Sequence, residues 1–330
     1  MIRNNNKVLI TGGSGYVGAQ ICRVLKKYGY EPIIIDFDKK RNWAVKDFTY
    51  FNYDFASQEA LQLISKYKPR TVLHLAAYHL VSESVSDPDK YYLNNVSKTR
   101  VLLESCVENK VKNFIFSGTG SVYGDCTTKK PLKENLTPKP SNPYADSKYT
   151  VERMLADYHH SFGLNYVSTR YFNAAGANPE GLNGYTQDPA SHVVPILMEK
   201  IINDQVFTIN GNDYETADGT CIRDYCHIND IAEGKIAAIK FLENGGKSGV
   251  INLGSGKGYS VMELINSVQK ITGKKLKIEV GSRRLGDVSY LCADISKAKE
   301  LLGWEPKLSL LDIFQDSHEW IKNKSLHVNS

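Results

Sequence analysis

A glycine-rich turn near the start of the chain limits the possible folds more than any other feature. Gly12, Gly15 and Gly18 directly follow the apolar run at residues 8–10 and directly precede a helical stretch at about 16–28. In this spacing the first glycine permits a tight turn, the second lets a phosphate approach the backbone, and the third lets helix and strand pack closely. The anion then faces the helix N-terminus. The turn therefore predicts a dinucleotide-binding unit.

An acidic residue, Asp36, stands 18 positions after Gly18 and ends the apolar run at residues 33–35. At the end of a second strand, a carboxylate can accept hydrogen bonds from the ribose hydroxyls of an adenosine, and it repels a 2′-phosphate. Asp36 therefore favours NAD over NADP, although an Asp in an ordinary strand-end turn is the alternative. Asp54 is a second candidate on the adenine side.

The first half of the chain alternates short apolar runs with helical stretches, which is the order of a parallel, doubly wound sheet. The runs that we expect as strands are residues 8–10, 33–35, 71–75, 114–116 and 166–171. The helices that we expect are residues 16–28, 88–108, 144–160, 195–203, 261–272 and 310–323. The predicted fold class is α/β, a Rossmann-type doubly wound parallel sheet with a smaller C-terminal α/β substrate-binding lobe.

A stretch rich in glycine, proline and asparagine, residues 174–189, marks the exit from the regular sheet. We expect residues 1–174, with about 221–254, to form the NAD-binding domain. Within this part, residues 250–253 would return to the first sheet. Residues 175–220 and 255–330 would form the second lobe.

Tyr144 and Lys148 lie four residues apart at the start of an expected helix, so both side chains share one face. A phenol has a pKa of about 10, and a nearby ammonium together with a cationic nicotinamide lowers that pKa. Tyrosine then becomes a usable base. An ordinary surface helix is the alternative for a bare pair. Thr119 supports the chemical interpretation, because it follows the run at 114–116, where the ligands of parallel sheets gather.

From residues 117–124 (SGTGSVYG) onward, the sequence resembles the extended short-chain dehydrogenase/reductase family, most closely the UDP-glucose (UDP-galactose) 4-epimerases, over nearly the whole chain. Further matching stretches are residues 74–77 (HLAA), 83–85 (ESV), 91–96 (YYLNNV), 142–144 (NPY) and 170–176 (RYFNAAG). The resemblance implies a UDP-hexose 4-epimerase with tightly bound NAD. Such an enzyme forms a transient 4-keto sugar and returns the hydride to its opposite face, with Tyr144, Lys148 and Thr119 as catalytic residues.

The resemblance also implies two sets of binding residues. Those for NAD are Gly12, Gly15, Tyr16, Val17, Gly18, Asp36, Asp54, Phe55, Leu75, Ala76, Ala77, Asn94, Ser117, Tyr144, Lys148 and Tyr171. Those for the UDP-sugar are Thr119, Tyr144, Asn173, His192, Val193, Thr208, Arg223, Arg284, Asp287 and Leu291. Arg223 and Arg284 suit the diphosphate, because arginine makes charge-assisted contacts with phosphate oxygens. Asp287 would meet the uridine ribose. Surface charge is the alternative for the two arginines.

Four positions depart from the pattern of the epimerases. Thr119 stands where many have Ser, and Asn210 where an aromatic residue commonly faces the uracil. Leu291 stands where enzymes restricted to unacetylated sugars can carry Tyr, which leaves room for UDP-GlcNAc and UDP-GalNAc. His79 replaces a Lys or Ser beside the cofactor, and we assign it no catalytic role.

Other enzymes of the same family are alternatives: a UDP-pentose or UDP-uronate epimerase, a 4,6-dehydratase or a keto-sugar reductase. A dehydratase carries an Asp-Glu pair where this chain has Gly120 and Ser121. A non-catalytic dinucleotide-binding sensor is a further alternative. The presence of Thr119, Tyr144 and Lys148 argues against it.

The composition bears on partners and location. The net charge of +5 comes from scattered Lys and Arg, without the basic stripe that nucleic-acid binding needs. The six cysteines are dispersed and show no metal or disulfide spacing, as expected of reduced thiols in the cytoplasm. The sequence shows no metal site, and no segment for export or for a membrane span. The resemblance implies a homodimer formed through the helices at about 88–108 and 144–160.

Overall fold

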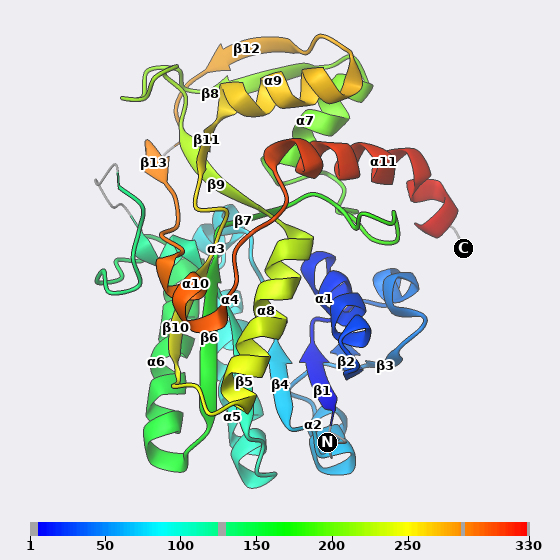
Figure 1. Ribbon diagram of the computed structural model, residues 1–330, viewed down its shortest axis with the longest axis vertical. Helices are drawn as coiled ribbons and strands as arrows, with labels where there is room; N and C mark the ends of the chain where they lie inside the picture. The colour runs from blue at the N-terminus through cyan, green and yellow to red at the C-terminus, as the bar shows by residue number, and fades with distance from the viewer. Residues whose placement is uncertain (1–5, 125–129, 285–287, 329–330) are drawn as a thin grey trace.

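The computed structural model describes residues 6–124, 130–284 and 288–328 (Figure 1). Its main sheet has seven parallel strands in the order β10-β6-β5-β4-β1-β2-β3. They are β1 (Lys7–Thr11), β2 (Glu31–Asp36), β3 (Thr49–Asn52), β4 (Thr71–His74), β5 (Asn113–Thr119), β6 (Asn165–Tyr171) and β10 (Gly249–Leu253). The strand order reverses between β1 and β4, as in doubly wound folds. The predicted fold class is confirmed, and so is the return of residues 250–253 to this sheet.

Two layers of helices cover the two faces of the main sheet (Figure 1). One layer holds α1 (Tyr16–Lys27) and α8 (Ile228–Glu243), and the other holds α2 (Gln58–Tyr67), α5 (Lys98–Glu108) and α6 (Pro143–Phe162). Side chains alternate between the faces of a strand. In β1, Val8 and Ile10 therefore pack in the core beneath α1 and α8, while Leu9 packs in the core on the opposite face. The sequence had predicted α1 and α6 but neither α2 nor α8.

The stretch expected as one helix at 88–108 has three parts. It begins as α4 (Pro88–Tyr91), continues as one π-helical segment, η2 (Tyr92–Ser97), and ends as α5. The short α3 (Val81–Ser86) precedes it. Among the helices that the structure describes, not one combines the length and the hydropathy of a membrane span.

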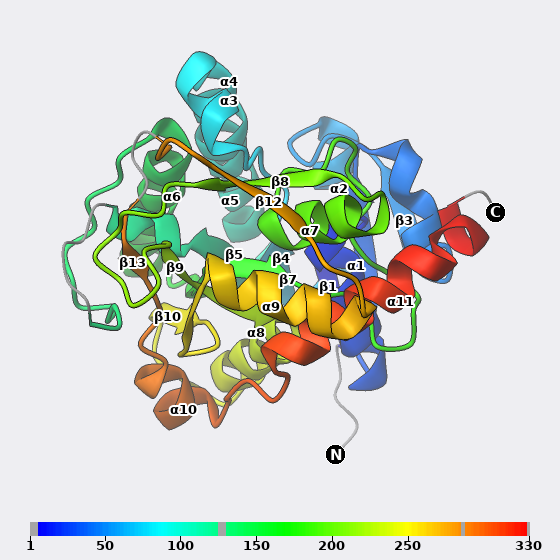
Figure 2. The ribbon, with the colours of Figure 1, turned by 90° about the horizontal axis from the view of Figure 1, so that it is seen from above.

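The second lobe lies beyond the carboxyl ends of the main strands (Figures 1 and 2). Its helices α7 (Val193–Ile202), α9 (Val261–Thr272) and α11 (Leu310–Val328) enclose a third apolar core. Two smaller sheets complete it: β8 (Val206–Asn210) with β12 (Lys277–Gly281), and β7 (Asn173–Ala175), β9 (Ile222–His227), β11 (Gly258–Ser260) and β13 (Tyr290–Leu291). The remaining elements are η1 (Lys39–Val45), η3 (Gly120–Tyr123) and α10 (Ser296–Leu302). The domain boundaries at 174, 221 and 254 stay a prediction.

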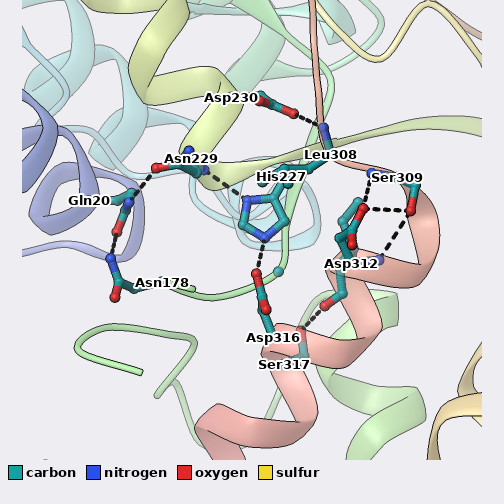
Figure 3. Close-up of polar contacts among 12 residues, drawn as sticks. Gln20, Asn178, His227, Asn229, Asp230, Leu308, Ser309, Asp312, Asp316 and Ser317 are labelled. Carbon is teal, nitrogen blue, oxygen red and sulfur yellow. Dashed lines mark hydrogen bonds and ion pairs between the residues drawn. The ribbon is translucent and has the colours of Figure 1, made fainter. Parts of the chain in front are cut away.

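A chain of hydrogen bonds connects α1 to the C-terminal helix (Figure 3). The Gln20 amide accepts from Asn178 and donates to Asn229, each at 2.9 Å. The backbone N–H of Asn229 donates to Nδ1 of the buried His227 at 3.0 Å, and Nε2 of His227 lies 3.1 Å from Asp316 on α11. Since Nδ1 accepts, Nε2 carries a proton and donates to the carboxylate. The ring thus fastens α11 to the start of α8.

Candidate active site

The glycine-rich turn has the backbone geometry that a pyrophosphate needs. Gly12 has a φ of +73°, and a Cβ there would lie 2.6 Å from the Ala76 nitrogen. A Cβ on Gly18 would lie 2.2 Å from the Gly12 carbonyl oxygen, so larger residues would push α1 away from the turn. Gly15 is the N-cap of α1 and brings no side chain over the helix terminus. The turn therefore fits the diphosphate of a dinucleotide.

Asp36 lies buried at the end of β2, directly beside this turn. One carboxylate oxygen accepts from the Ser14 N–H at 3.0 Å and from the Ser14 hydroxyl at 2.7 Å, and the other accepts from the Asp38 N–H at 3.2 Å. A carboxylate offers about four acceptor positions, so these bonds orient it and leave acceptor capacity. This geometry suits the predicted contact with ribose hydroxyls.

Further residues predicted to bind the cofactor follow β3 and β4, and of these Asp54 is the candidate for the adenine side. Asp54 forms an ion pair with Lys98 of α5. The Phe55 side chain is buried and packs edge-on against His74, with ring centroids 4.9 Å apart. After β4, the N–H groups of Leu75 and Ala76 both donate to the Thr11 carbonyl, at 3.0 and 3.1 Å, which holds the segment 75–77 beside the turn.

Helix α6 begins where the sequence places it. The Asn142 side chain accepts from the Ala145 N–H at 2.9 Å, and Pro143 occupies the first helical turn. Both are favoured helix-start residues. Tyr144 therefore lies in the first turn of α6, and Lys148 lies one turn later, where α6 packs on β5 and β6.

Tyr144, Lys148 and Thr119 meet at the carboxyl end of β5. The Lys148 amine is buried and donates to the Ser117 carbonyl at 2.9 Å, and it lies 4.8 Å from the centroid of the Phe116 ring. The Thr119 hydroxyl lies near the Tyr144 phenol and acts to lower its pKa. The structure thus brings the three predicted catalytic residues together, with Ser117 supporting the lysine.

The surroundings of this cluster bring the lysine closer to neutrality. Burial lowers the pKa of Lys148 to about 7, while the carboxylate of Glu152 acts in the opposite direction. Burial also raises the pKa of Tyr144, and the nearby Thr119 hydroxyl opposes that rise. Ionising the phenol therefore needs positive charge nearby, which Lys148 and a cationic cofactor ring would supply. This arrangement suits the predicted proton transfer.

The π-helical segment η2 positions a residue that the sequence analysis had not singled out. Asn94, predicted to touch the cofactor, donates to the Asn95 side chain at 3.1 Å. The buried Asn95 in turn clamps both backbone groups of Tyr78, each at 3.0 Å, and donates to Ser147 at 3.1 Å. π-helical turns concentrate at functional sites. Two adjacent asparagines within a helical stretch were the available sequence signal.

Three predicted substrate contacts meet on the sheet formed by β7, β9 and β13. Leu291 of β13 pairs in parallel with Arg223 of β9, and Asn173 of β7 pairs with Tyr225. The Asn173 amide donates to the carbonyl of Asp224 at 2.8 Å. These side chains come from segments far apart in the sequence.

His192, predicted to line the substrate site, is the N-cap of α7, and Val193 begins that helix. Its ring stacks on His79 with centroids 6.0 Å apart, and its Nδ1 lies 3.3 Å from the Tyr185 hydroxyl. Burial, and then His79, lower the pKa of His192 to about 4. Burial, and then Lys148, also lower the pKa of His79. Near neutral pH both imidazoles are therefore uncharged hydrogen-bonding groups.

Two further predicted substrate residues, Thr208 and Arg284, lie on or beside the separate β8–β12 sheet. Thr208 of β8 is exposed and donates to Glu279 at 2.7 Å. Arg284 is exposed, while its neighbour Arg283 pairs with Asp213 at 2.7 Å. Asp287 lies outside the described residues. Within the described ranges, no three His, Cys, Asp or Glu side chains lie close enough together to hold a metal ion.

The remaining predicted cofactor residues lie around the same strand ends. The Tyr16 hydroxyl donates to the Gly176 carbonyl at 2.5 Å, and Val17 packs against the core beneath α1. Ala77 follows the segment held beside the turn, and Tyr171, at the end of β6, pairs with Thr119. All predicted cofactor residues thus lie on β1 to β6, α1, α6, η2 or their connections.

The fold and this site define a dinucleotide-dependent enzyme of the short-chain dehydrogenase type. Residues 8–254 match the NAD dependent epimerase/dehydratase family. The UDP-glucose 4-epimerase of Halalkalibacterium halodurans is 39% identical over 95% of this chain and 94% of its own. The chain belongs to the NAD dependent epimerase/dehydratase family.

Solved structures agree with this assignment. The UDP-glucose 4-epimerase from Brucella ovis in complex with NAD is 38% identical, with a TM-score of 0.90 over 95% of this chain and 97% of that one. The UDP-Glc/GlcNAc 4-epimerase from Campylobacter jejuni is 35% identical, with a TM-score of 0.84 over 96% and 99%. The predicted family and the NAD cofactor are therefore confirmed.

Proposed function

We propose that this protein is a UDP-hexose 4-epimerase that interconverts UDP-glucose and UDP-galactose with bound NAD. The observation that carries the proposal is the cluster at the end of β5, where Tyr144 lies beside Thr119 and Lys148 donates to the Ser117 carbonyl. The cluster lies close to a turn that fits a pyrophosphate. The relatives described above are named as UDP-glucose or UDP-Glc/GlcNAc 4-epimerases.

Bound NAD supplies a reversible hydride acceptor at C4′ of the sugar. Tyr144 is positioned to take the proton of the 4′-hydroxyl and later to return it, while Thr119 hydrogen-bonds the same oxygen. Charge on Lys148 favours the phenolate. Because one residue both removes and returns the proton, the cycle leaves the enzyme unchanged and inverts C4′ if the keto sugar presents its other face.

The second lobe would hold the nucleotide during this turn of the sugar. We assign Asn173, Arg223 and Arg284 to the diphosphate and Asp287 to the uridine ribose, while Thr208, His192 and Val193 line the nucleotide site. Leu291 packs beside the cluster of Val122, Tyr123 and Leu132, and it leaves more room than a tyrosine would. UDP-GlcNAc is therefore included among the proposed substrates.

A dehydratase is disfavoured by the structure of η3. A Cβ at Gly120 would lie 2.8 Å from the Phe172 ring, so an acidic side chain at this position would displace Phe172. The acid needed to eliminate water has no place there.

The test uses purified protein without added NAD. It is incubated separately with UDP-glucose, UDP-GlcNAc and UDP-xylose, and the products are separated by chromatography. We expect UDP-glucose to yield UDP-galactose, and Tyr144→Phe to lower that rate at least a hundredfold, the usual scale of general base catalysis. Full activity in Tyr144→Phe would refute the assignment.

We also propose a homodimer in the cytoplasm. Leu102 and Leu155 lie in the core of their own chain, which leaves the half-buried Val101 and Met154 for a subunit seam. Sedimentation of Met154→Glu should show monomers if α5 and α6 form that seam. The cytoplasmic location rests on the dispersed cysteines.

A further inference from the structure

A lysine lies buried beneath the active site on the face of the sheet opposite Lys148's helix. Lys235 of α8 has no exposed surface, although its side chain ends in an amine. The Nζ atom lies 2.8 Å from the Ser117 hydroxyl of β5 and 2.7 Å from the Thr169 hydroxyl of β6, and 5.3 Å from the centroid of the Tyr171 ring. Burying an amine so deeply costs free energy unless hydrogen bonds compensate for the lost contact with water.

Polar side chains are buried on both faces of β5 and β6, but their partners differ between the two faces. On the α6 face, Glu152 and Arg170 form a buried ion pair at 2.6 Å. On the α8 face, Lys235 has no carboxylate within ion-pair distance in the described part of the chain; its partners are hydroxyls. Lys148 from α6 is close enough to lower the pKa of Lys235, and Tyr171 from β6 places its ring beside the amine.

The hydrogen-bond partners of Lys235 match the donors of an uncharged amine. The Thr169 hydroxyl donates to the Phe116 carbonyl at 3.0 Å, so its oxygen accepts from Lys235. A neutral amine has two N–H donors, and two hydroxyl oxygens are in reach, whereas an ammonium would bring a third donor. Burial, and then the charge on Lys148, hold the pKa of Lys235 well below its usual value. Lys148 can then keep its proton as the only charged amine of the two.

Ser117 connects this buried amine to the proton-transfer cluster. Its carbonyl accepts from Lys148, and its hydroxyl accepts from Lys235. Tyr171 lies near the same residue, which opposes the rise that burial causes in the pKa of the Tyr171 phenol. Ser117 and Tyr171 are both predicted to touch the cofactor. A shift of Ser117 would therefore move the lysine that acts on Tyr144 and the wall of the cofactor site together.

We propose that Lys235 is a positioning residue for the 4-epimerase reaction: its amine fixes Ser117 and Thr169 from below the sheet, and thereby sets the place of Lys148 beside Tyr144. The proposal rests on the proposed function for the reaction. It does not require that Lys235 touch the sugar or the cofactor.

The test compares Lys235→Met with Lys235→Gln and with the control Lys240→Met. Met keeps most of the length of the lysine side chain without its donors, and Gln supplies an amide group that can donate. Lys240 lies on the same helix, with its amine 3.8 Å from the centroid of the Tyr28 ring at the periphery. The measurements are kcat, KM, the pH profile of kcat, Tm and the dissociation constant of NAD from stripped protein.

For Lys235→Met we expect kcat to fall about tenfold, the loss of roughly one well-placed hydrogen bond, and NAD to bind about tenfold more weakly, with KM within about twofold. The acid limb of the pH profile should move to higher pH, because a displaced Lys148 favours the Tyr144 phenolate less. Lys235→Gln should lie between this variant and the wild type, and Lys240→Met should match the wild type.

A purely structural lysine would change Tm and leave kcat, the pH profile and NAD binding at wild-type values, and that result would overturn the proposal. If Lys235→Met does not fold, Lys235→Gln decides: wild-type kcat and NAD binding in that variant would also overturn it. If the wild type converts no UDP-hexose, the proposed function fails, and NAD binding by the variants still decides whether Lys235 positions Ser117.

Discussion

The buried ion pair beneath the active site allows a sharp stability prediction. Glu152 and Arg170 each expose 3% of their side chains. The Glu152 carboxylate accepts from Arg170 at 2.6 and 3.0 Å and from the Ser168 hydroxyl at 2.8 Å. Glu152→Gln keeps the shape but removes the counter-charge, which leaves a buried guanidinium uncompensated. Breaking such a pair costs about 3–5 kcal/mol.

The expected shift in Tm follows from the size of the protein. The entropy of unfolding is about 2.1 cal/mol/K per residue, or about 0.7 kcal/mol/K for 330 residues. Dividing the lost free energy by this entropy predicts that Glu152→Gln lowers Tm by about 4–7 °C. The variant should also lose activity at neutral pH, because the Glu152 charge supports the protonated form of Lys148. Scanning calorimetry is done at saturating NAD, since bound ligand raises Tm by mass action.

The matched control is Glu319→Gln. Glu319 pairs with Lys322 one turn away on α11, outside the proposed subunit seam, and their side chains are 47% and 52% exposed. Exposed helical pairs contribute about 0.3–0.5 kcal/mol, so this variant should shift Tm by less than about 1 °C. Equal Tm values for the two variants would refute the reasoning that burial makes the Glu152 pair indispensable.

Three further predictions follow from single contacts. Burial lowers the pKa of His74 to about 3 from the ordinary 6.5, so the unfolded chain binds one more proton than the folded chain between these pH values. The free energy of unfolding should therefore rise with pH across this window and fall by up to about 4–5 kcal/mol on acidification. Urea titrations of His74→Asn should show a smaller fall. Leu291→Tyr should lower turnover of UDP-GlcNAc at least tenfold while UDP-glucose turnover stays within threefold, as measured by chromatography; equal losses for both sugars would argue against a steric role. Asp316→Ala leaves the Nε2 proton of His227 without its acceptor and should cost about 1–3 kcal/mol, seen as faster proteolysis of α11, whereas Asp316→Asn keeps an acceptor and should be milder.

The sequence allowed much of the main sheet to be predicted, because several of its strands contain short apolar runs. The runs at 8–10 and 33–35 became β1 and β2, and α9 began and ended at the predicted residues. Helix α8 escaped prediction. Its residues are buried on most sides, and Gly234 and Lys235 interrupt the apolar pattern. Gly234 is required by packing, because a Cβ there would lie 2.9 Å from the Leu253 side chain. Buried all round, it shows weak helical periodicity.

The same reason explains which parts of the candidate site were foreseen. Tyr144 and Lys148 are four residues apart, so a local rule predicts that they share a face. Lys235 lies 118 positions from Ser117, and no local pattern joins them. The π-helical turn that sets Asn95 against Tyr78 depends on a change in hydrogen-bond spacing within a stretch that reads as ordinary helix.

A usable sequence signal nevertheless lies in the strands themselves. β5 and β6 are buried on both faces, yet their carboxyl halves turn polar at 117–119 and 168–170. In a strand, neighbouring side chains face opposite layers, so each polar run must be satisfied from both sides at once. Here Arg170 and Ser168 meet a fixed charge, Glu152, on one side, while Ser117 and Thr169 meet the amine of Lys235 on the other. The ion pair cancels its own charge, and an uncharged Lys235 adds none. The net positive charge under Tyr144 is then that of Lys148 alone, which is the condition for one lysine to govern the ionisation of the phenol.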